Sequence, residues 1–149
     1  MNAYVPRVLG AVVAVVLTAS ADASAPAGRY TTASGTVYDT KTKLTWQQDA
    51  PSTTYTWGDA KTYCAGVGAS LPGTGWRLPT IKELLTIVDD SRSNPSIDPT
   101  AFPATPANYF WSSSPWADSP SYAWNVHFNY GYPGYQAAVS NMFHVRCVR

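Results

Sequence analysis

The sequence is poor in charge. It holds ten basic and nine acidic residues among 149, and its formal net charge is +1. Nucleic-acid-binding domains usually carry a basic patch or stripe, so we predict no nucleic-acid partner. The glycine period of collagen and the sustained heptads of a coiled coil are also missing, which excludes both fibrous classes. What the chain does have is a 45% apolar fraction with six tryptophans and ten tyrosines, enough for the core of one globular domain.

No comfortable membrane span is visible either. The apolar N-terminal run, Val8–Leu17, is about half of the roughly 20 residues that a spanning helix needs. A basic residue precedes it and the small residues Ala21–Ala23 follow, a pattern typical of a secretory signal peptide. We predict a signal peptide over residues 1–23, cleaved before Ser24, and a mature N-terminal segment over residues 24–34. Cleavage after Ala25 and an uncleaved anchor are the alternatives.

Export determines how the two cysteines, Cys64 and Cys147, are interpreted. In an oxidising compartment, a single pair of cysteines is most simply one disulfide. The chain-entropy model assigns a loop of this length roughly 4.5 kcal/mol. A catalytic thiol and half of a metal site are the alternatives, and neither has the partner residues it needs nearby in the sequence.

Capping patterns predict two short helices. Thr56 is the expected N-cap of the first, in which Trp57, Ala60 and Cys64 follow one apolar stripe. Thr80 and Glu83 form a capping box for the second helix, whose apolar stripe continues to Val88. A proline-rich stretch over residues 91–107 follows and is expected to be a long irregular loop.

Other segments alternate with a period of two and predict strands. Thr36–Asp39 and Leu44–Gln47 suggest a hairpin, and Tyr109–Ser112 suggests a buried strand. Residues 124–129 are expected to have one core face and one polar face, the polar face carrying Asn125 and His127.

In the closing strand, we expect one core face with these residues: Phe143, Val145 and Cys147. The opposite face would carry these: His144, Arg146 and Arg149. The expected core tryptophans are Trp46, Trp57, Trp76, Trp111 and Trp124. Helices in the first half with antiparallel strands at both ends predict an α+β domain.

Several phrases together resemble a known bacterial family. They are Gly35–Asp39, Leu44–Gln47, Ala60–Cys64, Gly75–Thr80, Glu83–Leu84, Tyr109–Ser113, Ala123–Trp124 and Val145–Arg149. The pattern is similar to the C-terminal domain of the Legionella collagen-like adhesin, a trimer on a collagen-like stalk. The resemblance implies a domain over residues 35–149 with a C-type-lectin-like fold: two short helices, antiparallel strands and long irregular loops. It also implies a role in adhesion, because that domain is associated with binding sulfated glycosaminoglycans. The oligomeric state of this chain is left open.

Clustered aromatic and polar residues near the C-terminus are the best candidates for ligand binding. Aromatic faces can stack on a sugar ring while amide and imidazole groups bond its hydroxyls. The alternative is that these rings lie over the edge of the core and stiffen the loops. The predicted ligand residues are Trp116, Asn125, His127, Tyr130, Tyr132 and Tyr135.

Metal and catalytic sites are not predicted. Asp89, Asp90 and Asp98 could supply oxygens, but they lack the spacing of a calcium-binding loop. His127 and His144 are the only histidines, and no serine stands in a nucleophile-elbow motif. We therefore expect no metal, no cofactor and no enzyme activity.

Basic residues allow two interpretations. Arg77 is expected to pair with Glu83 or an aspartate rather than to contact an anion. The other basic residues would form either a modest basic patch or an ordinary solvated face. They are Lys41, Lys43, Arg146 and Arg149.

The sequence as a whole predicts a secreted, periplasmic or cell-surface binding module. Its expected partner is a glycan or an extracellular protein, contacted through the loop face, with no stable membrane insertion after signal cleavage. The alternative function is a structural or assembly domain of the cell envelope with no small ligand.

Overall fold

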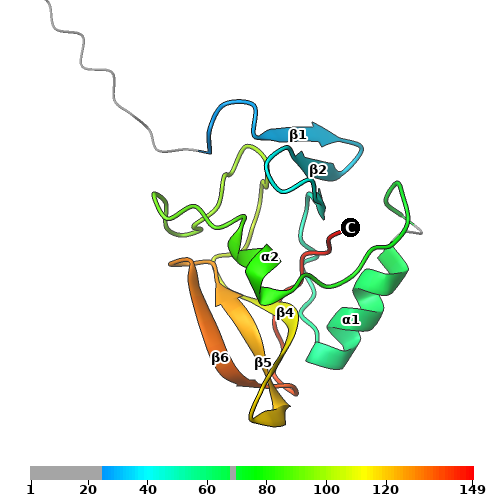
Figure 1. The fold of residues 1–149 in the computed structure, drawn as a ribbon, viewed down its shortest axis with the longest axis vertical. Coiled ribbons are helices and arrows are strands. Elements are labelled where there is room, and N and C mark those ends of the chain that lie inside the picture. Colours follow the sequence, from blue (N-terminus) through cyan, green and yellow to red (C-terminus); the bar gives the residue numbers. More distant parts are fainter. Residues whose placement is uncertain (1–24, 68–69) are drawn as a thin grey trace, which may run out of the picture.

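The computed structural model describes residues 25–67 and 70–149, so the predicted signal peptide, residues 1–23, lies outside the described residues. These residues form two α-helices and six strands in two separate three-stranded antiparallel sheets. The prediction of an α+β domain is confirmed. The two sheets lie at opposite ends of the molecule, with α1 (Trp57–Gly66) along one side and α2 (Ile81–Leu85) between them (Figure 1).

The first sheet has the order β1-β2-β3, formed by Tyr30–Ala33, Thr36–Asp39 and Thr45–Gln47. The predicted hairpin is present as β2 and β3, with Val37 opposite Trp46. β1 was not predicted, and it lies within the segment over residues 24–34. It pairs with β2 through a two-residue turn in which Ser34 and Gly35 both have positive φ, the conformation that tight hairpin turns favour.

The second sheet has the order β4-β5-β6, formed by Tyr109–Trp116, Ser119–His127 and Tyr132–Ala138. β4 is twice as long as the predicted strand because it continues through a register shift beyond Trp111. The serines at this shift tie the sheet to the start of α2. Ser113 donates its amide to the Pro79 carbonyl (2.7 Å), and Ser114 Oγ accepts from the Ile81 amide (3.0 Å).

Both helices begin where capping predicts. Thr56 caps α1 by accepting from the Asp59 amide, and Thr80 with Glu83 forms the complete capping box of α2. The expected continuation of α2 to Val88 was wrong, because the helix ends at Leu85. Thr86 turns its hydroxyl back to the Glu83 carbonyl (2.6 Å), and its own carbonyl accepts from the Arg29 guanidinium (2.5 Å). The Thr86 carbonyl therefore links the end of α2 to Arg29, which precedes β1 of the first sheet.

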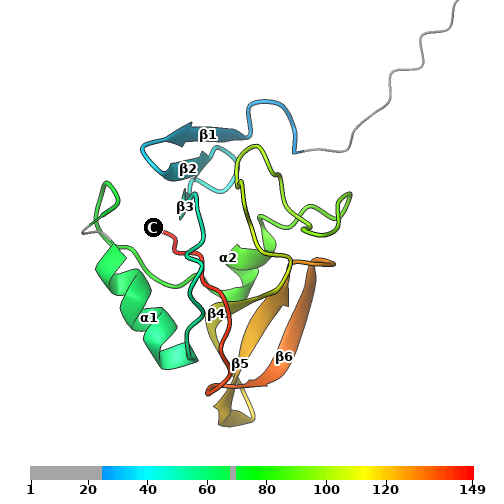
Figure 2. The same cartoon turned by 180° about the vertical axis from the view of Figure 1, so that it is seen from behind.

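The C-terminal segment runs between the two sheets and joins them (Figure 2). Val148 bridges to Trp46 of β3, and His144 bridges to Phe110 of β4. Because neighbours cover this segment on both sides, the expected polar face was wrong: His144 and Arg146 are buried together with Val145 and Cys147. Only the terminal Arg149 of the expected polar residues is exposed.

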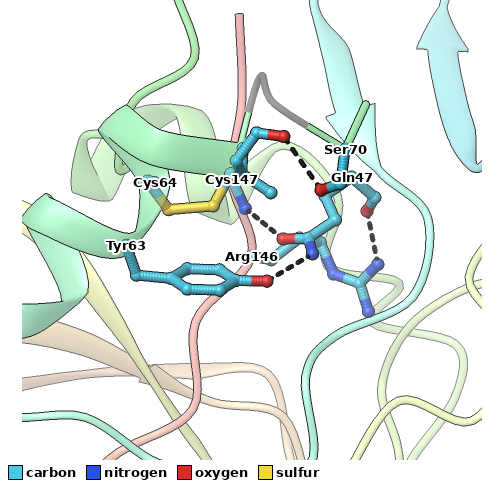
Figure 3. Close-up of a disulfide and its surroundings, with 7 residues drawn as sticks. Gln47, Tyr63, Cys64, Ser70, Arg146 and Cys147 are labelled. Atoms are coloured by element: carbon cyan, nitrogen blue, oxygen red, sulfur yellow. Dashed lines mark hydrogen bonds between the residues drawn. A yellow bond between two sulfur atoms is a disulfide. The ribbon is translucent and has the colours of Figure 1, made fainter. Parts of the chain in front are cut away.

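The disulfide Cys64–Cys147 anchors α1 to this segment, as predicted (S–S 2.07 Å), and both cysteines are fully buried. Gln47 of β3 supports the bridge from the other side (Figure 3). Its side-chain oxygen accepts from the Cys147 amide (3.3 Å), and its side-chain nitrogen donates to the Tyr63 hydroxyl (3.0 Å). The disulfide therefore sits where α1, β3 and the C-terminal segment meet.

Two hydrophobic clusters form the core, one on each face of the second sheet. One packs Phe110, Val126 and Phe128 against residues of α2 and the first sheet. The other packs Trp111, Ala123 and Val145 against α1 and the disulfide. Of the five tryptophans expected in the core, three are buried: Trp46, Trp76 and Trp111. Trp57 is partly buried and packs against the second cluster. The prediction was wrong for Trp124, which is only partly buried and belongs to neither cluster.

No helix within residues 25–67 and 70–149 has both the length and the apolar character needed to cross a membrane.

Candidate functional site

Three aromatic side chains form a row across the second sheet. Tyr109 of β4 stands opposite His127 of β5, which stands opposite Tyr132 of β6. Residues directly opposite each other in antiparallel strands project from the same face, so the register places the three rings side by side. Tyr109 meets His127 edge to face, with ring centroids 4.2 Å apart, and stacks on Phe143 behind it at 4.8 Å.

The row continues into the turn after β5 and forms a shallow hollow of about 390 Å³. The Tyr130 ring lies nearly parallel to His127 (5.9 Å between centroids) and to Tyr132 (6.3 Å). Tyr130 is 60% exposed and Tyr132 is 70% exposed. This hollow, hereafter the aromatic hollow, is lined by Tyr109, His127, Tyr130, Tyr132, Pro133 and Gly134.

The turn that presents Tyr130 is held firmly by backbone contacts. The Tyr130 and Gly131 amides both donate to the His127 carbonyl (3.2 and 2.9 Å). Gly131 has a φ of +79°, and a Cβ atom there would lie 2.6 Å from Val88 Cγ1, so a side chain is excluded by both conformation and space. The preceding Phe128 carbonyl accepts from the amide and the hydroxyl of Ser96 (2.7 and 2.8 Å). The long loop thus fixes the turn in place.

A second aromatic group lies near the β4–β5 turn. Trp116 stacks on Tyr135 with ring centroids 5.1 Å apart, and Trp124 packs against both rings. Trp124 stands three residues before His127, so strand alternation places the two on opposite faces of the sheet. The predicted ligand residues are therefore divided: His127, Tyr130 and Tyr132 form the aromatic hollow, whereas Trp116 and Tyr135 belong to the second group.

Asn125 does not belong to either surface. It is 2% exposed, and a Cβ atom on Gly134 would lie 2.5 Å from its side-chain oxygen. That oxygen has no hydrogen-bond partner among the described residues. The sequence places Asn125 on a polar face beside His127, but the second core cluster covers that face from Trp111 onward. The prediction that Asn125 is a surface ligand residue was therefore wrong: its side chain is buried against Gly134.

Two residues of these aromatic groups were missed in the sequence. Tyr109 was assigned to a buried strand, yet it is 40% exposed and lines the aromatic hollow. Trp124 was assigned to the core, yet it packs in the second group. Strand alternation could identify the face of each residue, but the register that brings Tyr109 opposite His127 depends on a pairing between distant segments.

The residues that line the aromatic hollow carry no permanent charge. None of its six lining residues is lysine, arginine, aspartate or glutamate. The sequence holds no lysine or arginine between Arg92 and Arg146. The hollow is therefore a surface of rings and hydroxyl groups without a fixed charge.

The predicted pairing of Arg77 is confirmed. Its guanidinium makes two hydrogen bonds to the Glu83 carboxylate (2.8 and 2.6 Å). These bonds and those from Thr80 lower the pKa of Glu83 to about 2. The charge of Arg77 is thus already neutralised within the fold.

Arg146 is fully buried, so a basic patch that includes it is ruled out. One guanidinium nitrogen donates to the carbonyls of Gln47 and Gln48, and the other donates to Thr105 Oγ1 (2.7 Å). The guanidinium also lies 4.7 Å from the centroid of the Phe102 ring. Burial lowers the pKa of Arg146 to about 9. This side chain joins the first sheet to the long loop.

Two of the three aspartates considered for calcium, Asp89 and Asp98, already have partners within the fold. Asp89 accepts from the Ser91 amide (3.0 Å) and pairs with Arg92, whereas Asp98 accepts from the Thr100 and Ala101 amides. Across the described part of the chain, no group of three or more histidine, cysteine, aspartate or glutamate residues is placed to hold a metal ion.

Comparison with known protein families identifies the domain. Residues 35–149 match the family described as Lcl C-terminal domain, and this range covers most of the chain. The chain belongs to the Lcl C-terminal domain family. This agrees with the resemblance seen in the sequence and indicates an extracellular, adhesin-associated domain. None of the curated proteins matches the chain in sequence.

Proposed function

We propose that this Lcl C-terminal domain is an exported, non-catalytic binding module that recognises a glycan or a protein at a cell surface. The observation that carries the proposal is the aromatic hollow, whose two most exposed rings, Tyr130 and Tyr132, stand on a turn fixed by the long loop. Exposed aromatic rings that gather in one hollow are a common feature of binding sites. The buried disulfide suits an oxidising compartment outside the cytoplasm.

We also propose that the fold is C-type-lectin-like. The late segment pairs with the early sheet through Val148 and Trp46, two helices flank the strands, and a long irregular loop covers one side. The residues that line the aromatic hollow stand on strands β4, β5 and β6 and on one tight turn. A preorganised surface loses less entropy when it binds.

The test is attachment of the oxidised chain to a glycan array and to immobilised extracellular matrix proteins. We expect a specific ligand on at least one of them, and we expect the Tyr130→Ala/Tyr132→Ala double variant to lose it without losing its folded circular dichroism spectrum. Tyr38→Ala, which removes a half-exposed ring from the first sheet, is the matched control and should bind normally. Retained binding by the double variant would show that the proposed surface is wrong. A chain that binds neither the glycan array nor the matrix proteins would favour the envelope-assembly alternative.

A further inference from the structure

The aromatic hollow carries a more specific assignment, which rests on the proposed function. We propose that it binds an uncharged pyranose ring, and that a sulfated or otherwise anionic saccharide is not its ligand. Three features of the hollow support this assignment: its charge, its free hydroxyl groups and the fixed position of its rings.

The first feature is charge. A sulfate or carboxylate group that leaves water needs a cation or several hydrogen-bond donors in exchange. The hollow offers no lysine or arginine. Arg92 is the last arginine before these residues in the sequence, and it pairs with Asp89 (3.2 Å). Arg146 is the first arginine after them; it is buried, and its two terminal guanidinium nitrogens donate to other groups. An anionic sugar would therefore meet no lysine or arginine among the lining residues, and only the tyrosine hydroxyls and the imidazole of His127 could replace its hydration.

The second feature is the supply of unused polar groups. The hydroxyls of Tyr109, Tyr130 and Tyr132 make no hydrogen bond to any residue that the structure describes. The imidazole of His127 stands between two of these rings, in contact with Tyr109 and Tyr130. A pyranose combines apolar C–H faces with a rim of hydroxyl groups. Rings with free hydroxyls at their edges match both parts of that chemistry.

The third feature is rigidity. The tyrosine on the turn, Tyr130, follows a backbone held by Ser96 and by the His127 carbonyl, and Gly131 fits tightly against Val88. Tyr109 is fixed by stacking on Phe143. A volume of about 390 Å³ lies at the small end of the range found for ligand pockets, about 300 to 1,000 Å³, and suits one or two sugar rings.

The experiment uses the oxidised chain and two kinds of probe. The first is a panel of methyl glycosides of glucose, galactose, mannose and N-acetylglucosamine, and the second is heparin. Binding is followed by saturation-transfer NMR and titration at about 50 mM and about 500 mM salt. We expect one methyl glycoside to bind with a dissociation constant of about 1 mM, changing by less than about twofold across this salt range, because no charged contact is involved. Heparin should not compete for the hollow.

Matched variants locate the site. Tyr132→Ala should weaken glycoside binding at least about tenfold, because it removes one stacking face and one hydroxyl. Tyr122→Ala removes a half-exposed tyrosine from β5 outside the hollow, and Tyr135→Ala removes one from the second aromatic group. Both should bind as the unaltered chain does. Equal loss in Tyr135→Ala would place the sugar elsewhere and overturn the assignment.

The other outcomes separate this inference from the proposed function. Binding of heparin alone, falling steeply with salt, would overturn the neutral-sugar assignment but leave the chain a glycan-binding module. Binding of a matrix protein but of no saccharide would also overturn it and leave the more general proposal in place. Only a chain that binds none of these saccharides and no matrix protein would contradict both.

Discussion

The two sheets differ in how they use their polar groups. In the first sheet, the buried Asp39 carboxylate pairs with Arg29 (2.9 Å) and accepts from the Lys41 amide (2.9 Å). In the second, the stretch from residue 109 to residue 138 contains one acidic residue, Asp118, and no lysine or arginine. Charged groups of the first sheet therefore stabilise the fold, whereas the second sheet has tyrosine hydroxyls free at its surface.

Under the proposed function, this difference separates the residues that stabilise the fold from the residues that bind a ligand. Arg29 also donates a hydrogen bond to the Thr86 carbonyl, so this one arginine links Asp39 of the first sheet to the end of α2. Removing any partner leaves a buried group unpaired, which is costly. The exposed rings of the second sheet have no such partners. Their loss should change binding much more than folding.

The largest expected effect comes from Asp39→Asn. This substitution keeps the volume of the side chain but removes the charge that faces Arg29, whose side chain is itself mostly buried. Breaking a buried ion pair on one side typically costs 3 to 5 kcal/mol, and we expect about 3 kcal/mol here because Arg29 keeps its bond to Thr86. Chemical denaturation with a two-state fit measures the loss.

Asp118→Asn is the matched control for that substitution, because it removes one carboxylate from an exposed turn of the second sheet. It should change the free energy of unfolding by less than about 0.5 kcal/mol. If both variants lost the same stability, the contrast between the sheets would disappear.

A smaller effect is expected from the Arg77–Glu83 pair, which is partly exposed. The pKa of Glu83 lies at about 2 in the folded chain against an ordinary value of 4.5, so its contribution is complete above about pH 4.5 and is lost as the pH falls toward 2. Solvent screening limits that contribution to about 1 kcal/mol. Glu83→Gln should destabilise the chain by this amount at pH 7 and by much less at pH 2, where about half of the folded carboxylates are protonated. An equal loss of unfolding free energy at both pH values would show that the carboxylate charge is not the cause.

The smallest effect on folding is expected from Tyr132→Ala. The side chain is 70% exposed and makes no hydrogen bond to any described residue, so the free energy of unfolding should fall by no more than about 0.5 kcal/mol. Phe143→Ala is the comparison variant, because that ring supports both Tyr109 and Trp111. It should cost about 3 kcal/mol. A loss of that size in Tyr132→Ala would mean that the hollow serves the core.

Local signals predicted much of this fold. Thr56 and Thr80 begin the two helices, since an N-cap depends on residues within one turn. The β2–β3 hairpin likewise follows from adjacent residues. The pairing of the two cysteines needed only the oxidising compartment inferred from the N-terminal segment.

Burial set by distant segments could not be predicted in the same way. Arg146 has the sequence position of an exposed strand residue, yet the Gln47 carbonyl and Thr105 approach it from separate parts of the chain. Asn125 shows the same limit, because a core cluster covers the face on which it stands. Alternation identifies the two faces of a strand, but tertiary packing decides which of them meets water.

The disulfide has a consequence for survival among extracellular proteases. Every residue that lines the aromatic hollow, from Tyr109 to Gly134, lies between Cys64 and Cys147 in the chain. A single cut in the long loop over residues 91–107 therefore leaves the two fragments covalently joined. The hollow stays attached to the rest of the domain until a reductant or a second cut arrives.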